Sequence, residues 1–153
     1  MRILVVSDIH GHASALRSAL LQQPQAETVI FLGDGVTDWE RESAALLGRR
    51  TLAVRGNCDW SAPGYPDQGL DEIAGVRVFY THGHRYGVKS GTECLVRVAA
   101  EQGAAVVLYG HTHRAVAEYR DGVHLLCPGA LANGEYGLVD ILPQGVLLQT
   151  CRI

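Results

Sequence analysis

The sequence predicts an α/β fold in which two β-sheets pack face to face and helices cover their outer sides. The first half of the chain alternates apolar runs with segments of helical periodicity, whereas the second half holds pairs of strands separated by turn residues. The chain has 153 residues, of which 47% are hydrophobic, 19% are charged and 18 are glycines. This length and composition predict one domain, residues 1–153, with many tight turns.

The first half reads as three strands that alternate with two helices. The expected strands are residues 2–7, 28–32 and 51–54, and the expected helices are residues 13–23 and about 37–47. Pro24 ends the first helix, and Gly48 suits the position just after the second. This alternation is typical of a parallel sheet with right-handed crossovers.

The second half reads mainly as antiparallel hairpins that follow an irregular loop over residues 60–69. The expected pairs of strands are residues 70–73 with 76–80, 115–119 with 123–127, and 137–142 with 146–150. Ser90-Gly91-Thr92-Glu93 resembles a capping box, which predicts a helix from there to about residue 102. A buried strand is expected over residues 105–109.

The histidines are clustered far beyond chance. Six of the seven fall in His-x-His pairs, at residues 10/12, 82/84 and 111/113. Random placement would give about 0.3 such pairs, so three pairs indicate a common cause. If the chain stays extended after residue 109, His111 and His113 face the same side, as two ligands of a transition metal can.

Polar side chains follow five of the expected strands. They are Asp8 with His10, then Asp34, Asn57, His82, and the pair His111 and His113. Because ligands bind at the carboxyl ends of strands in open α/β sheets, we expect these side chains to converge. Asp8 alone would be read as a helix cap, and Gly33-Asp34-Gly35 alone as a turn. Together, two carboxylates, one amide and four histidines are too many for one tetrahedral zinc and suit two metal ions.

Charge, hydrophobic pattern and cysteine spacing give no sign of a nucleic-acid-binding, membrane-spanning or secreted protein. A net charge of −3 and a pI near 6.1 give no electrostatic footprint for nucleic acid or an anionic membrane. The first apolar run is too short for a signal peptide, and none approaches the roughly 20 residues that span a bilayer. Four cysteines show no zinc-ribbon spacing. We therefore expect a cytoplasmic protein with reduced thiols.

The polar strand ends resemble the motifs of the calcineurin-like metallophosphoesterases in order and spacing. The closest resemblance is to their small bacterial and archaeal phosphodiesterase branch, which also contains relatives of the small retromer subunit. The motifs are Asp8-x-His10, Gly33-Asp34, Gly56-Asn57-Cys58-Asp59, His82-Gly83-His84 and Gly110-His111-Thr112-His113. The resemblance covers nearly the whole chain and implies a four-layer α/β/β/α sandwich of two mixed sheets with a two-metal centre.

The resemblance also implies which residues hold each ion. One ion would be held by Asp8, His10, Asp34 and His113. The other would be held by Asp34, Asn57, His82 and His111, so that Asp34 bridges the two. The mixture of nitrogen and oxygen donors favours divalent transition metals, with manganese expected first and nickel, zinc, iron or cobalt as alternatives.

The activity implied by the resemblance is hydrolysis of a small phosphodiester by a hydroxide that bridges the metals. Asn57 and His84 are the candidate catalytic residues. Arg55, Arg85 and Arg114 lie beside the motifs and are candidates for substrate binding, although solvated surface arginines are commoner. No nucleic-acid or membrane partner is expected, and a homo-oligomer is left open.

Two alternatives stay open beside the phosphodiesterase. Cys58 stands where the broader superfamily usually has a histidine, and an ordinary thiol is a poor substitute for that imidazole. This departure disfavours a phosphomonoesterase, the first alternative, and leaves the acid for the leaving group unassigned, with His12 and His84 as candidates. The second alternative is a protein-binding scaffold that keeps the metal pocket without catalysis.

Overall fold

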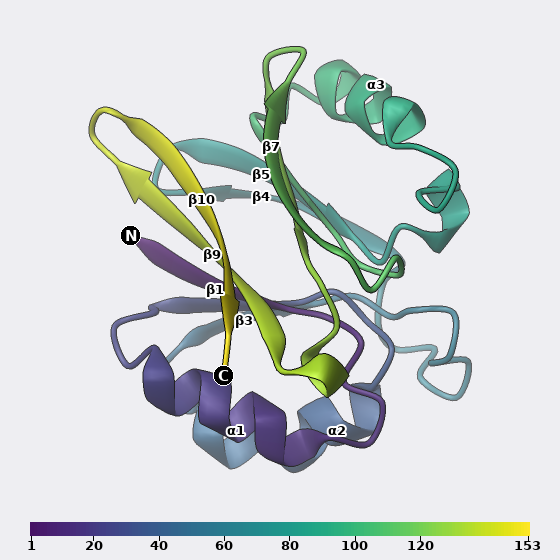
Figure 1. Ribbon diagram of the computed structural model, residues 1–153, viewed down its shortest axis with the longest axis vertical. Helices are drawn as coiled ribbons and strands as arrows, with labels where there is room; N and C mark the ends of the chain where they lie inside the picture. The colour runs from purple at the N-terminus through teal and green to yellow at the C-terminus, as the bar shows by residue number, and fades with distance from the viewer.

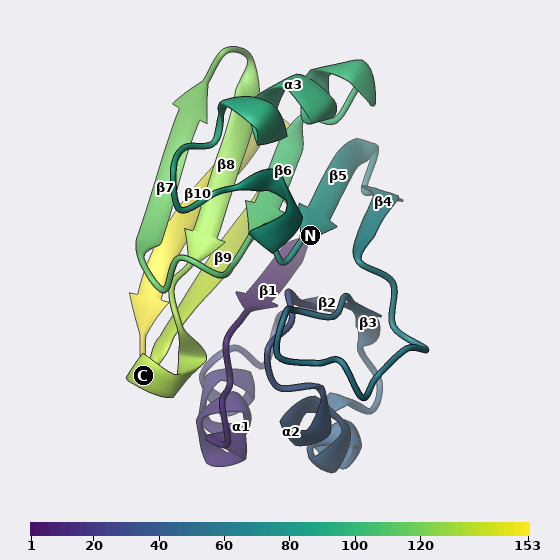
Figure 2. The same ribbon diagram turned by 90° about the vertical axis from the view of Figure 1, so that its right-hand side faces the viewer.

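A computed structural model describes all residues, 1–153, as four layers in the order helix, sheet, sheet, helix (Figure 1). Helices α1 and α2 lie under the first sheet, and α3 covers the outer face of the second (Figure 2). The predicted four-layer α/β/β/α sandwich of two mixed sheets is therefore confirmed. No helix in the structure has the length and apolar content needed to cross a membrane.

The first sheet has the strand order β10-β9-β1-β2-β3. Its strands are β1 (Arg2–Val6), β2 (Thr28–Phe31), β3 (Arg50–Ala53), β9 (Glu135–Leu142) and β10 (Gly145–Arg152). Strands β1, β2 and β3 are parallel, and β9 runs antiparallel to both β1 and β10. The C-terminal hairpin thus completes the sheet that the N-terminus begins.

The second sheet has the strand order β4-β5-β6-β8-β7. Its strands are β4 (Gln68–Ile73), β5 (Val76–Thr81), β6 (Val106–Tyr109), β7 (Ala115–Arg120) and β8 (Val123–Pro128). The hairpins β4–β5 and β7–β8 were predicted, but β5, β6 and β8 run parallel to one another. The three expected antiparallel hairpins therefore form, but the second sheet is mixed because its three central strands pair in parallel.

Alternating side chains on the buried strands build three apolar layers. On β1, Ile3 and Val5 face the layer between the sheets, while Leu4 and Val6 face α1 and α2. On β6, Val106 and Leu108 face between the sheets, and Val107 faces α3. Because both faces of these strands are buried, they read as continuous apolar runs in the sequence.

The helices are shorter than the sequence predicted. They are α1 (Ala13–Gln22), α2 (Val36–Arg41) and α3 (Glu93–Glu101), with short 3-10 turns at Ser43–Leu46, His84–Tyr86 and Leu131–Asn133. The predicted second helix breaks after residue 41 into the first of these turns. The predicted capping box does not form, since Thr92 occupies the N-cap without a side-chain hydrogen bond.

The carboxyl ends of β1, β2, β3, β5 and β6 all lie at the same edge of the two sheets (Figure 2). Gly110 packs against the residues that follow β1, where a Cβ at this position would overlap the Ser7 hydroxyl group. A larger residue at 110 would therefore have to displace the Ser7 side chain. This edge carries the polar residues singled out in the sequence.

Candidate metal centre

The first group of candidate ligands joins the loop after β1 to the loop after β6. Asp8 Oδ1 lies 2.9 Å from His113 Nε2 and 3.6 Å from His10 Nε2. Donor atoms of Asp8, His10 and His113 all lie within 4.8 Å of one another. Asp8 is fully buried and both histidines reach the surface, so an ion here would be open to a substrate on one side.

The second group joins the loops after β2, β3, β5 and β6. Asp34, His82 and His111 place their donor atoms within 4.8 Å of one another, and Asp34 Oδ2 lies 3.3 Å from His82 Nε2. Asn57 Oδ1 lies 3.1 Å from the same His82 nitrogen. The structure thus brings together all seven residues assigned to metal binding, although their role as ligands stays a prediction.

The backbone at these loops is held in an unfavourable conformation. Only seven residues other than glycine have a positive φ, and five of them are candidate ligands: Asp8, His10, Asp34, His111 and His113. The other two, Ala74 and Asp121, each precede a glycine in a hairpin turn. Left-handed conformations cost of order 1–3 kcal/mol each and persist where the surroundings enforce them.

The same backbone conformation corrects one prediction about His111 and His113. Their φ angles of 68° and 55° are left-handed, so the chain is not extended after β6. The imidazole of His113 consequently lies against His10, at 5.3 Å between ring centroids, while that of His111 lies against His82, at 5.1 Å. Each histidine of the pair therefore belongs to a different group of donors.

The donors of the second group fit a cation. His82 Nδ1 donates to the carbonyl oxygen of Leu32 at 2.7 Å, which fixes the tautomer and leaves Nε2 free to face Asn57 Oδ1 and Asp34 Oδ2. A ring nitrogen and two oxygens that converge in this way need a proton or a metal ion between them. In the metal-free chain, burial opposes charge on His82, but Asp34 outweighs it and raises the pKa of the imidazole. Burial likewise opposes charge on Asp34, yet His82 and the Cys58 N–H hold the pKa of this carboxyl well below its ordinary value.

Asp59 is a positioning residue that the sequence analysis did not assign. Its Oδ2 accepts the backbone N–H groups of Asp34 and Gly56, and its Oδ1 accepts those of Gly35 and Val36, at 2.7–3.0 Å. A carboxylate with four N–H donors is strongly stabilised. Its place three residues after Gly56 was the only signal in the sequence, because the other three donors come from a different loop.

The remaining candidates at the centre differ in their surroundings. His84 lies near His82 and His111, and its Nδ1 is buried without a hydrogen-bond partner. Burial and the positive charge of neighbouring groups lower the pKa of His84, so its imidazole is neutral at pH 7. Burial and the nearby Asp34 raise the pKa of Cys58 to about 11, which keeps the thiol protonated.

Two of the three candidate arginines are already engaged. Arg55 Nε and Arg85 Nη1 both lie within 2.9 Å of the Asp67 carboxylate. Arg114 follows His113 directly and is exposed. Outside the centre, the His12 ring contacts the backbone carbonyls of Ile9 and His10, and the His124 ring packs at a tilt against Tyr119 in the β7–β8 hairpin.

Comparison with known proteins agrees with this geometry. Residues 1–141 match the sequence profile of the calcineurin-like phosphoesterase superfamily domain. The chain is 30% identical over 131 residues to the probable metallophosphoesterase YsnB of Bacillus subtilis, which covers 86% of this chain and 75% of that protein. It is 30% identical over 157 residues to the phosphodiesterase MJ0936 of Methanocaldococcus jannaschii, covering 92% and 90%.

A solved structure of an archaeal phosphodiesterase extends the similarity to the whole fold. It superposes with a TM-score of 0.77 at 26% identity and covers 99% of this chain and 100% of its own. The superfamily profile, at residues 1–141, spans every strand end that carries a candidate ligand, and the shared fold covers 99% of the chain. The chain therefore belongs to the calcineurin-like phosphoesterase superfamily and is a phosphoester hydrolase.

Proposed function

We propose that this hydrolase is a phosphodiesterase that works with two divalent transition-metal ions, manganese first among them. The observation that carries the proposal is the position of Asp34. Its Oδ2 lies 3.3 Å from His82 Nε2 in one group of donors and 4.0 Å from His10 Nε2 in the other. One carboxylate that faces both groups is the arrangement that a bridged pair of ions needs.

Bound metal ions would supply the chemistry that metal-dependent hydrolases share, and the residues of this chain would orient the substrate beside the ions. Bound divalent cations acidify a water to supply the nucleophile and offset negative charge on phosphoryl oxygens. The Asn57 amide, which contacts His82 through Oδ1 and reaches Cys58 Sγ through Nδ2, can turn its N–H toward a phosphoryl oxygen. His84 can donate one N–H to the ester, since its neutral ring keeps a single proton.

The surroundings of Cys58 support a diester over a monoester. A thiol whose pKa is about 11 gives up no proton near neutral pH, so it cannot replace an imidazole beside the leaving group. A diester with an acidic leaving group needs little protonation of that group.

The four cysteines are free, which supports a cytoplasmic location for the enzyme.

The test compares two aryl esters after loading the purified protein with Mn²⁺ or Ni²⁺. We expect faster release of 4-nitrophenolate from bis(4-nitrophenyl) phosphate than from 4-nitrophenyl phosphate. Faster cleavage of the monoester would overturn the substrate class. A protein that binds two equivalents of metal and cleaves neither ester would be a scaffold, not a phosphodiesterase.

A further inference from the structure

A cavity of about 390 Å³ opens beside the loop that carries His111 and His113. It is lined by Val88, Lys89, Tyr109, Thr112, Arg114 and Val116. Thr112 stands between the two histidines in the chain, and Arg114 follows them, so the loop that carries these candidate ligands also lines the cavity. Its lining contains two cationic side chains and no acidic one.

Lys89 and Arg114 differ from every other cationic side chain in the protein. Each of the remaining arginines forms an ion pair or donates a side-chain hydrogen bond, to carboxylates, backbone carbonyls or, for Arg97, the Cys94 thiol. Lys89 and Arg114 have neither, and both are exposed. Lys89 is also the only lysine among the 13 basic residues. The two cationic side chains at this cavity therefore have no ion-pair partner.

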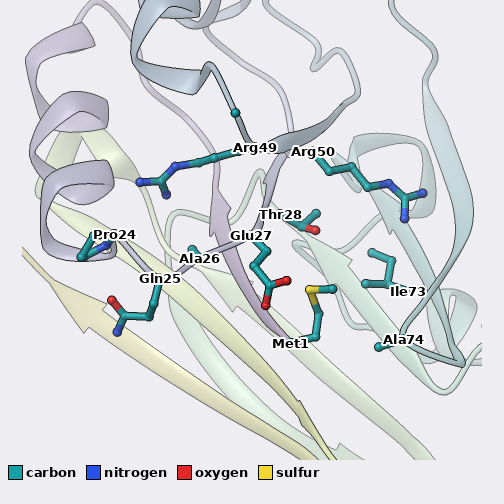
Figure 3. A pocket seen from close by; sticks show the side chains of 11 residues that line it. Met1, Pro24, Gln25, Ala26, Glu27, Thr28, Arg49, Arg50, Ile73 and Ala74 are labelled. Atoms are coloured by element: carbon teal, nitrogen blue, oxygen red, sulfur yellow. The ribbon is translucent and has the colours of Figure 1, made fainter.

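A second, larger cavity elsewhere in the protein provides a contrast. It measures about 510 Å³ and lies at the opposite edge of the first sheet, where strands β2 and β3 begin (Figure 3). Its arginines are engaged, because Arg49 donates to the carbonyls of Leu20 and Gln23, and Arg50 pairs with Asp71. Glu27 also lines it. Positive charge without an ion-pair partner is thus a property of the cavity beside the loop that carries His111 and His113.

The other residues of the smaller cavity define what else it can hold. Val88 and Tyr109 are buried and Val116 is partly buried, so they offer an apolar wall. An occupant that matches both features has an apolar or aromatic body and a negative charge that reaches Lys89 and Arg114. Such a molecule could extend from a phosphoryl group bound next to His111 and His113.

We propose that this cavity binds one arm of the phosphodiester, and that this arm combines an apolar body with a second anionic group. Lys89 and Arg114 are then specificity-determining residues that select doubly anionic diesters over singly charged ones. The inference rests on the proposed phosphodiesterase function and adds a substrate class to it. It concerns binding of the retained arm and leaves the hydrolytic step unchanged.

Two matched diesters test the proposal. Both release 4-nitrophenolate when water displaces it from phosphorus, and the retained arm is either a 4-carboxyphenyl or a 4-carbamoylphenyl group. We expect the metal-loaded enzyme to prefer the carboxylate ester about tenfold in kcat/KM at low salt, mainly through a lower KM. Lys89→Gln and Arg114→Gln should each remove most of this preference by raising KM for the carboxylate ester more than KM for the carbamoyl ester. Arg97→Gln, which removes an exposed charge from α3, is the matched control and should keep the preference.

A second readout does not depend on turnover. Because Lys89 is the only lysine, acylation of its amine can be followed by mass spectrometry of the peptide that contains it. We expect 4-carboxyphenyl phosphate to slow acylation of Lys89 more than 4-carbamoylphenyl phosphate does.

The outcomes separate the two proposals. Failure of the wild type to cleave either diester would overturn the proposed function, and selective protection of Lys89 would then still support the anionic subsite. Equal cleavage of both diesters, or equal protection by both phosphates, would overturn the subsite and leave the phosphodiesterase standing. A preference for the carboxylate ester that persists in both Lys89→Gln and Arg114→Gln would also overturn the subsite.

Discussion

The carboxylate of Asp59 accepts the backbone N–H of Asp34 at 2.7 Å, so one buried acid fixes the loop that presents the other. Three more N–H groups, those of Gly35, Val36 and Gly56, reach the same carboxylate. Asp34 can therefore hold its left-handed backbone, at φ 60°, before any cation binds. The geometry of the centre therefore depends on a residue that is not itself a candidate ligand.

Asp59→Asn tests this dependence. Either orientation of the amide turns its NH₂ group against two backbone N–H donors, so we expect a loss of about 2–4 kcal/mol in the free energy of unfolding. Metal content and esterase activity should fall with it. Asp121→Asn, in an exposed hairpin turn, is the matched control for urea unfolding and metal analysis. Full metal content in Asp59→Asn would show that the loop does not need this carboxylate.

Asp34→Asn should affect both groups of donors at once. An amide keeps the shape of the carboxylate but loses the charge that can join two cations, so activity should drop about 100-fold or more. Metal analysis should find fewer equivalents bound than in the wild type. Retention of the wild-type metal stoichiometry would refute a bridging role.

Replacement of His113 should reveal the conformational strain at its backbone. A φ of 55° is favourable for glycine and strained for alanine. In the presence of a chelator, we therefore expect the free energy of unfolding of His113→Gly to exceed that of His113→Ala by about 1 kcal/mol. At His124, which lies in strand β8 without a positive φ, the order should reverse. Urea titration of the four variants checks this, and equal stability of the His113 pair would mean that the loop relaxes without strain.

Acid should weaken the ion pair that ties β1 to β9. Asp140 accepts Arg2 Nε at 2.7 Å and Nη2 at 2.8 Å, and this arginine holds the pKa of Asp140 below its ordinary value of 3.8. Because the folded-state pKa is depressed, the stabilisation is present above pH 4 and disappears as the pH falls through that lower pKa.

Asp140→Asn should therefore lower stability by about 1–2 kcal/mol at pH 7 and converge with the wild type in acid. Urea unfolding as a function of pH measures both limits. Glu101→Gln, an exposed acid without an ion pair, should show no such pattern. A constant difference between Asp140→Asn and the wild type at every pH would exclude the carboxylate charge as its cause.

The sequence predicted the strands and the edge of the sheet that carries the site, because buried strands are short apolar runs and polar residues follow them. Asp8, Asp34 and His82 were found by this rule. The left-handed backbone at His111 and His113 could not be read from the sequence, since tertiary contacts enforce it against local preference.

Other features depended on partners far along the chain. Asp59 stands three residues after Gly56, but three of its four donors come from the loop after β2. Strands β5 and β8 look like hairpin arms in the sequence and β6 like a single buried strand, and only their order in space shows that the three pair in parallel. Lys89 stands out in the sequence only as the single lysine. Its proposed role became visible when the structure placed it in the same cavity as Arg114.

Each group of donors takes side chains from both sheets, since Asp8 and Asp34 follow strands of the first and His82 and His113 follow strands of the second. The first sheet in turn needs β9 beside β1, so it is incomplete until the ribosome has made the last quarter of the chain. Loading with metal should accordingly follow synthesis of β9. Chains stalled between Arg114 and Glu135, which already contain all seven candidate ligands, should retain no ion during gel filtration, whereas chains that include β9 should, and metal analysis of both would check this.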